Sequence, residues 1–174
     1  MDTSDEWIQT RTGIKERRRA AAGERSSHMA TKAGEIALEK AGISASQLGG
    51  IIVATASPDF PGFPSTACLI QEQLGISDKP IMAFDITAAC SGFNYAITTA
   101  QQYIKTGFTD HILVVGVDCL SEITDWSDRG TCILFGDGAG AIVLGPVDEG
   151  RGILYSQLHS NGSLADSLKV SFPE

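Results

Sequence analysis

The residue in this sequence best suited to nucleophilic chemistry is Cys90, in the stretch IMAFDITAACSGFNYAITTA (residues 81–100). An apolar, strand-like run ends near Asp85 and a helical pattern begins near Cys90, which predicts that the thiol lies in the first turn of a helix. Backbone N–H groups at a helix start lack partners within the helix, and the helix dipole favours negative charge there, so this position favours the thiolate.

The neighbours of Cys90 are all small: Ala88, Ala89, Ser91 and Gly92. They leave room for a thioester carbonyl to approach the sulfur and for an N–H group to hold an oxyanion. Local features alone therefore support a catalytic nucleophile. A cysteine that simply packs at a helix start is the alternative.

The other cysteines and the histidines give no second catalytic or metal site. Three cysteines form no CxxC pair and lie in apolar surroundings, which predicts buried thiols; they are Cys68, Cys119 and Cys132. The histidines, His28, His111 and His159, are scattered, and none has a second His or a Cys at ligand spacing. We therefore expect no metal, and no local Cys/His or Ser/His/Asp set.

Length and charge restrict the classes of function. With 174 residues the chain is the size of one domain, and its formal charge of −8 argues against nucleic-acid binding. The one basic run, residues 15–25, is expected to be a solvated loop face. No apolar run approaches the ~18 residues of a membrane span, and the acidic N-terminus is unlike a signal peptide. These features predict a soluble, cytoplasmic protein with no membrane partner.

Helices and buried strands alternate along the chain. The predicted helices span residues 27–41, 66–74 and 90–105, and the predicted strands span residues 50–55, 81–84 and 111–117. This alternation favours βαβ units and a mostly parallel sheet with helices on both faces, an α/β fold in αβα layers. Later apolar runs, within residues 131–147 and 152–160, predict antiparallel strands added to the sheet.

A glycine cluster in FGDGAGAIVLG (residues 135–145) raises the alternative of a dinucleotide-binding domain. The spacing is GxGxG, and the residues that follow are β-branched and form no amphipathic helix that could meet a pyrophosphate. A tight turn between strands is therefore the favoured interpretation.

The segment DITAACSGFNYAI resembles the nucleophile segment of thiolase-like condensing enzymes, specifically β-ketoacyl-acyl-carrier-protein synthase III. Five further segments occur in the order of that family: DTSDEWIQTRTGIKER, FPSTACLIQEQLGI, LVVGVD, TDWSDRGTCILFGDGAGAIVL and HSNGS. Together they cover nearly the whole chain and are far more specific than one cysteine among small residues. The resemblance implies a thiolase-like fold with a sheet of the five-stranded type.

The resemblance also implies an activity. In the family, an acyl-CoA, commonly acetyl-CoA, acylates the cysteine that Cys90 matches, and malonyl-acyl-carrier-protein is then decarboxylated and condensed, which initiates fatty-acid synthesis. The N–H of Cys90 would form part of the oxyanion hole. Because the CoA thioester is a substrate, no cofactor is implied, and the family forms homodimers.

Other site residues follow from the resemblance alone. Trp7, Arg11, Thr12 and Arg129 match CoA-binding positions, with the tryptophan and Arg129 on either side of the adenine. Leu120, Leu134 and Phe135 match acyl-pocket positions, and Phe63 matches a residue that reaches into the pocket of the partner subunit. Without the resemblance, a packed Trp7, a surface salt bridge at Arg129 and ordinary core residues would be preferred.

The sequence departs from the family at both ends. Family members have a strand before the DTSDEW segment and a second half that supplies a catalytic His and Asn. We therefore expect residues 1–174 to form an N-terminal thiolase-like domain that lacks the usual first strand and the whole C-terminal half, and that does not condense alone. Another thiolase-like condensing enzyme or acyltransferase, and a non-catalytic half-domain that dimerises, remain alternatives.

Overall fold

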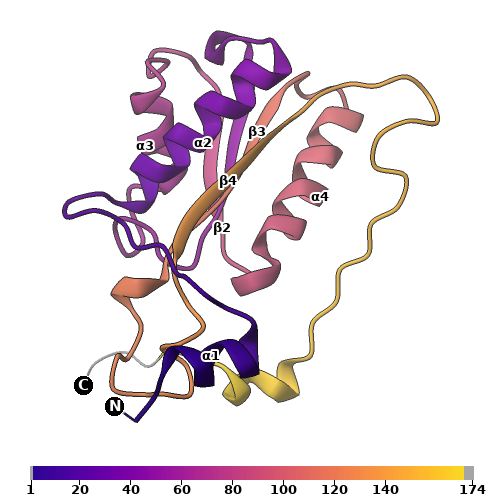
Figure 1. Ribbon diagram of the computed structural model, residues 1–174. Helices are drawn as coiled ribbons and strands as arrows, with labels where there is room; N and C mark the ends of the chain where they lie inside the picture. The colour runs from indigo at the N-terminus through magenta and orange to yellow at the C-terminus, as the bar shows by residue number, and fades with distance from the viewer. Residues whose placement is uncertain (1, 171–174) are drawn as a thin grey trace.

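The structure is a computed structural model that describes residues 2–170. Within that range a sheet of four strands has the order β2-β1-β3-β4 (Figure 1). The strands are β1 (Gly50–Ala54), β2 (Met82–Ile86), β3 (Ile112–Cys119) and β4 (Asp137–Leu144). Strand β1 pairs in parallel with β2 and β3, and β4 runs antiparallel to β3. The prediction of a mixed, mostly parallel sheet is confirmed.

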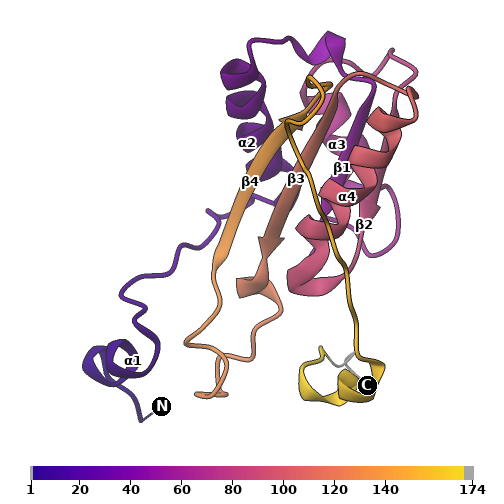
Figure 2. The same ribbon diagram turned by 90° about the vertical axis from the view of Figure 1, so that its right-hand side faces the viewer.

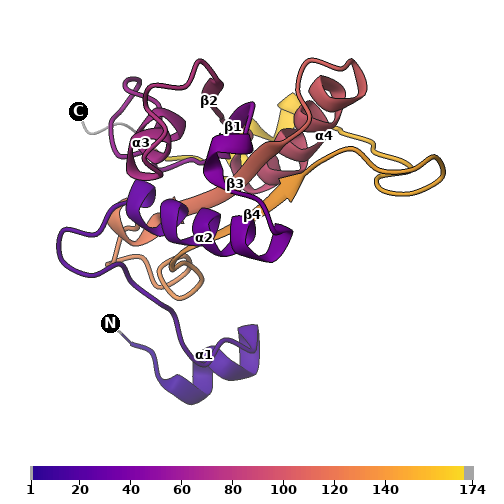
Figure 3. The ribbon, with the colours of Figure 1, turned by 90° about the horizontal axis from the view of Figure 1, so that it is seen from above.

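Helices cover both faces of the sheet, as predicted. Helices α2 (Ser26–Ala41) and α3 (Thr66–Gln73) lie on one face and α4 (Gly92–Lys105) lies on the other (Figures 1 and 3). Helix α1 (Asp5–Thr12) lies away from the sheet, below it in Figure 1. Short 3-10 turns are η1 (Ala45–Gln47), η2 (Ala89–Ser91), η3 (Leu120–Glu122) and η4 (Gly162–Ser167).

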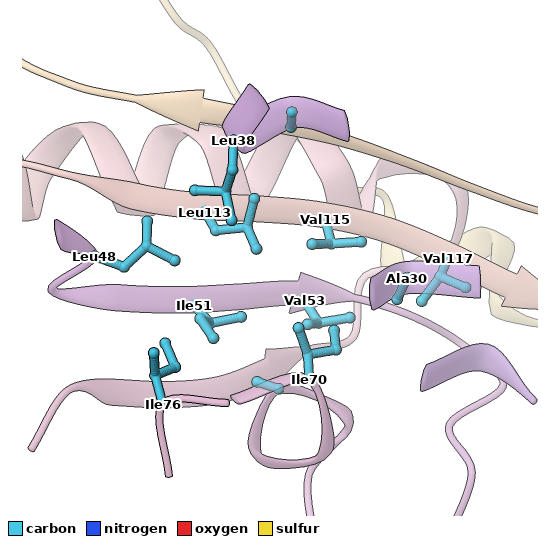
Figure 4. Close-up of a cluster of buried hydrophobic side chains, with 12 residues drawn as sticks. Ala30, Leu38, Leu48, Ile51, Val53, Ile70, Ile76, Leu113, Val115 and Val117 are labelled. Carbon is cyan, nitrogen blue, oxygen red and sulfur yellow. The ribbon is translucent and has the colours of Figure 1, made fainter. Parts of the chain in front are cut away.

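The core explains why the central strands are apolar along most of their length. On one face of the sheet Ile51, Val53 and Leu113 pack with residues of α2 and α3 (Figure 4). On the other face Ile52 and Val114 pack with residues of α4. Because successive side chains of a strand alternate between faces, a strand covered on both faces needs apolar residues at every position.

One strand prediction and one turn prediction are wrong. Residues 152–160 form no strand; Gln101 of α4 donates a 2.9 Å hydrogen bond to the carbonyl of Ile153, so the segment runs as irregular chain beside α4 (Figure 2). A strand needs a neighbouring strand for its backbone hydrogen bonds, and this segment has α4 instead. The glycine cluster is not a turn, since Gly138 and Gly140 lie inside β4 opposite Asp118 and Gly116.

Helix α1 was not predicted, although its end signals are present in the sequence. The Ser4 hydroxyl accepts a 3.1 Å hydrogen bond from the Trp7 N–H, and acidic residues occupy the first turn. Gly13 ends the helix with φ of 74°, which favours glycine. The helix has no buried residue and so lacks the apolar periodicity on which the other helix predictions rest.

No helix of residues 2–170 is long and apolar enough to cross a membrane. In the same range, no group of three or more His, Cys, Asp and Glu side chains could hold a metal ion.

Candidate active site

Cys90 lies at the junction between β2 and α4 and is exposed. It sits in η2, which continues directly into α4, so the prediction that α4 begins at Cys90 is wrong and the helix begins at Gly92. Ala89 has φ of 46°, a left-handed conformation that non-glycine residues seldom adopt. This sharp turn lets the chain leave the sheet and enter the helix with the thiol at the corner.

The thiol lines a cavity of about 330 Å³ at the carboxyl ends of β1 and β3 and the start of β4. Its lining consists of Ala54, Ala89, Cys90, Phe93, Gly116, Val117, Asp118, Gly136, Gly138, Ala139 and Gly140. The carboxyl ends of parallel strands are where α/β proteins commonly bind ligands. None of these described lining residues is a histidine or an asparagine.

Glycines shape this cavity in two ways: one lets two of its walls approach closely, and others leave space open inside it. A Cβ atom on Gly92 would lie 3.2 Å from the Cβ of Ala54, so glycine lets the start of α4 approach β1 closely. A Cβ atom on Gly138 or Gly140 would meet no atom within 4 Å, so these glycines leave open space instead. The glycine cluster of the sequence therefore forms a wall of the Cys90 cavity.

Asp118 also lines the cavity, but hydrogen bonds already occupy one oxygen of its carboxylate. Its Oδ1 atom accepts from the Ala56 N–H at 2.7 Å and from the Ser57 N–H and hydroxyl at 3.1 and 3.0 Å. These bonds fix the chain after β1 to the end of β3. Sequence reasoning missed this residue, for which the available signal was an acidic residue ending an otherwise apolar strand.

A larger cavity of about 600 Å³ lies between the end of α4 and residues 143–154. Its lining contains no cysteine, histidine or serine. Size therefore does not identify the site, and the smaller cavity with the thiol is the better candidate.

Three of the four residues matched to CoA binding come together at α1. The guanidinium carbon of Arg11 lies 4.2 Å from the centroid of the Trp7 ring, and that of Arg129 lies 4.7 Å from it. Arg129 also donates a 2.6 Å hydrogen bond to the carbonyl of Asp2. The hydroxyl of Thr12 donates to the Ile8 carbonyl at 2.8 Å, so it takes part in the end of the helix.

The residues matched to the acyl pocket do not line the cavity in the described structure. Leu120 and Phe135 are half-buried. Leu120 is the first residue of η3, and Phe135 directly precedes Gly136, which lines the cavity. The Leu134 side chain is 45% exposed, and that of Phe63 is 87% exposed on the loop between β1 and α3. Their role in holding an acyl chain stays a prediction.

Of the other three cysteines, two are buried and one is exposed. Cys119 and Cys132 are buried, as predicted, and burial raises the pKa of the Cys119 thiol. Cys68 is exposed, so the prediction that it is buried is wrong; it lies in the first turn of α3 with its Sγ 3.9 Å from the Ala83 carbonyl.

Cys68 and Cys90 both lie near a helix start, but the two starts are occupied differently. At α3 the Asp85 carboxylate accepts from the Thr66 and Ala67 N–H groups at 2.7 and 2.9 Å, and Ser65 caps the next N–H. At α4 no side chain caps the first turn. Negative charge that develops during a reaction can therefore be held at Cys90, whereas Asp85 already neutralises the start of α3.

Comparisons with known proteins identify the family. The family described as 3-oxoacyl-[acyl-carrier-protein (ACP)] synthase III matches residues 84–162. The chain is 56% identical to a β-ketoacyl-[acyl-carrier-protein] synthase III of Geobacillus kaustophilus over 163 residues, covering 94% of the chain and 52% of the relative. For the corresponding protein of Oceanobacillus iheyensis the identity is 54%, over 98% of the chain and 54% of the relative.

A solved structure gives the same result. The chain superimposes on 3-oxoacyl-[acyl-carrier-protein] synthase III of Aquifex aeolicus with a TM-score of 0.87 and 52% identity, covering 94% of the chain and 52% of that structure. The chain thus spans about half the length of the curated relatives it matches. The resemblance found in the sequence motifs is confirmed. The chain belongs to the β-ketoacyl-[acyl-carrier-protein] synthase III family and shares its thiolase-like fold.

Proposed function

We propose that this chain supplies the acyl-accepting cysteine of a β-ketoacyl-[acyl-carrier-protein] synthase III, an acyltransferase that initiates fatty-acid synthesis in the cytoplasm. The observation that supports this most is the exposed Cys90 thiol, which lies at the sharp β2–α4 junction and faces a cavity walled by glycine. The names of the relatives agree with it. The direct test is transfer of an acetyl group from acetyl-CoA to Cys90.

The first step in this proposal is acylation. The Cys90 thiolate attacks the thioester carbonyl of acyl-CoA, a new carbon–sulfur bond forms, and the tetrahedral oxyanion collapses with loss of the CoA thiolate, which takes up a proton. The N–H of Cys90, in η2, and the N–H groups at the start of α4, which no side chain caps, are suited to hold the oxyanion. The CoA thioester is a substrate, and the proposal needs no cofactor.

The second step joins the acyl group to malonyl-acyl-carrier-protein. Loss of carbon dioxide from the malonyl group leaves an enolate, whose carbon attacks the acyl-cysteine and releases β-ketoacyl-acyl-carrier-protein and the Cys90 thiolate. The enolate oxygen requires hydrogen-bond donors. The described lining of the cavity offers no imidazole or carboxamide, and the Asp118 carboxylate only accepts. Other groups must therefore supply those donors.

The Trp7 cluster suits the nucleotide part of CoA. An indole and a guanidinium present flat faces to a purine, and a second guanidinium, that of Arg11, can pair with phosphate oxygens. The Arg129 guanidinium contacts the Trp7 indole directly in this structure. An adenine that binds there must therefore enter between the indole and this guanidinium, or displace the guanidinium.

We also expect the protein to form dimers through the loop that carries Phe63, the residue matched to one that reaches into the pocket of the partner subunit. A ring that is 87% exposed can bury its surface against a second copy, which would stabilise the pair by about 1.5–3 kcal/mol for each ring. By light scattering at micromolar concentration the wild type should exceed the monomer mass. Phe63→Ser should weaken dimerisation at least about 10-fold.

Phe108→Ser is the matched control for this measurement, because Phe108 is also exposed, at 65%, but lies on the loop after α4. Phe108→Ser should have the same light-scattering mass as the wild type. A wild type that is a monodisperse monomer would contradict the expectation, and so would equal effects of the two substitutions. Dimerisation without any acyl transfer to Cys90 would favour the alternative of a non-catalytic dimerising half-domain.

A further inference from the structure

The residues between α1 and α2 bind closely to the chain that precedes β4. We call residues 14–20 the strap. Within it, Arg17 donates through Nε, at 2.7 Å, and through a terminal nitrogen to the carbonyl of Ile133. The N–H of Asp137 donates to the Arg18 carbonyl at 2.8 Å. The strap therefore joins the CoA-binding helix proposed above to the loop that leads into the Cys90 cavity.

The Asp137 carboxylate is the centre of this contact. Its Oδ2 atom accepts from the Ala20 N–H at 2.8 Å and from the Ser121 hydroxyl at 2.7 Å, and its Oδ1 atom accepts from the Ser121 N–H at 2.8 Å. One side chain thus connects the strap, η3 and the first residue of β4.

The Asp137 carboxyl remains ionised at neutral pH. Partial burial by itself acts to raise its pKa, but the hydrogen bonds from Ser121 and Ala20 outweigh that effect and hold the pKa below its usual range. Because the folded pKa is lowered, the contact is complete at neutral pH and is lost only as the pH falls through that lowered value.

Packing around Asp137 leaves little freedom for the strap to shift. A Cβ atom on Gly136 would lie 2.9 Å from the Arg18 carbonyl oxygen, so only glycine lets the segment before β4 approach the strap this closely. The guanidinium carbon of Arg19 lies 4.9 Å from the Trp126 ring centroid, and the Trp126 indole donates to the Ser121 carbonyl at 3.2 Å. The strap, η3 and the chain before β4 therefore form one connected unit.

This unit has the proposed CoA-binding residues at one end and the cavity at the other. Trp7 and Arg11 lie on α1, directly before the strap. Gly136 and Gly138, on either side of Asp137, line the cavity with Cys90. We propose that Asp137 is a positioning residue that sets the distance between bound CoA and the Cys90 thiol, an inference that rests on the proposed function.

A carboxylate is required because all three partners are donors. An asparagine in its place keeps one accepting oxygen, but its NH2 group cannot accept, so at least one of the three N–H or O–H groups loses its partner. The strap and η3 are then no longer held to the same side chain.

The test compares the wild type with Asp137→Asn and, as a matched control, Asp125→Asn. The Asp125 carboxylate lies in the segment between η3 and β4 and also accepts hydrogen bonds, but from Ser127 only two residues away. Mass spectrometry follows two rates at Cys90: acetylation by acetyl-CoA below saturation, which uses the CoA-binding residues, and alkylation by iodoacetamide, which does not.

Asp137→Asn should acetylate Cys90 about 10- to 100-fold more slowly, as a misplaced reactant does, while its alkylation rate stays that of the wild type. Asp125→Asn should match the wild type in both rates. Equal acetylation of wild type and Asp137→Asn would overturn the inference and leave the proposed function intact. A parallel fall in both rates would also overturn it, because the carboxylate would then act on the fold or the thiol itself.

Two further outcomes are decisive. If Asp137→Asn is unfolded by circular dichroism, Ser121→Ala replaces it, because this change removes one donor and leaves the carboxylate in place. Ser121→Ala should slow acetylation about threefold without slowing alkylation, and an unchanged acetylation rate would overturn the inference. A folded wild type that alkylates at Cys90 but takes no acetyl group would overturn both the proposed function and the inference.

Discussion

Incubation of the 174-residue chain with acetyl-CoA and malonyl-acyl-carrier-protein should yield no detectable β-ketoacyl-acyl-carrier-protein, even where Cys90 becomes acetylated. Decarboxylation produces an enolate, and the described lining of the Cys90 cavity has neither a histidine nor an asparagine to stabilise it. Loss of one such donor typically lowers a rate about 100- to 1000-fold, and here the pair is missing from the lining. The measurement is separation of the acyl-carrier-protein species by mass.

The positive control for this assay is the Geobacillus kaustophilus relative, of which the chain covers 52%. Its product under the same conditions would establish that the substrates and the detection work. Rapid product formation by the 174-residue chain would contradict the account, since the cavity described here would then be sufficient for both steps.

Trp7→Ala should weaken CoA binding about 10- to 100-fold, because stacking of a base on an aromatic side chain contributes about 1–3 kcal/mol. Removal of the indole also takes away the ring against which Arg11 and Arg129 lie at 4.2 and 4.7 Å. Titration calorimetry with CoA measures the effect, and pantetheine, which has no nucleotide, should bind both proteins equally.

Tyr155→Ala serves as the matched control for Trp7→Ala, because Tyr155 is an aromatic residue 76% exposed in the irregular chain after β4. It should bind CoA as the wild type does. Equal CoA affinity of the wild type and Trp7→Ala would contradict the proposal that the indole contacts the nucleotide.

The sequence was sufficient for those elements whose signals are local. Helix α2 ends before Gly42 as its pattern predicts, and the β-branched run of β1 is a strand buried on both faces. The strand predicted at residues 152–160 failed because a strand depends on a partner that its own residues do not specify. Helix α1 was missed because its sequence signals are the residues that cap its two ends, Ser4 and Gly13, and it has no apolar face.

The candidate site divides in the same way. Cys90 could be found from its neighbours, because a thiol between a strand and a helix is a local feature. The contacts of Asp118 and Asp137 could not, since their partners Ala56 and Ala20 lie 62 and 117 residues away in sequence. The approach of Arg129 to Trp7 likewise joins distant parts of the chain, and only the family resemblance indicated it.

The most direct test of the central claim, that Cys90 is the acyl-accepting nucleophile, is to incubate the folded protein with acetyl-CoA and map the modified residue by mass spectrometry. We predict one slow acetyl adduct on Cys90, sensitive to hydroxylamine as a thioester is and absent as a thioester in Cys90→Ser. Cys68 is also exposed, but it lies in the first turn of α3, where the Asp85 carboxylate accepts from the Thr66 and Ala67 N–H groups; it should remain unmodified and serves as the internal control. Acetylation of Cys68 in preference to Cys90, or no acetylation of a protein whose Cys90 reacts with iodoacetamide, would contradict the account.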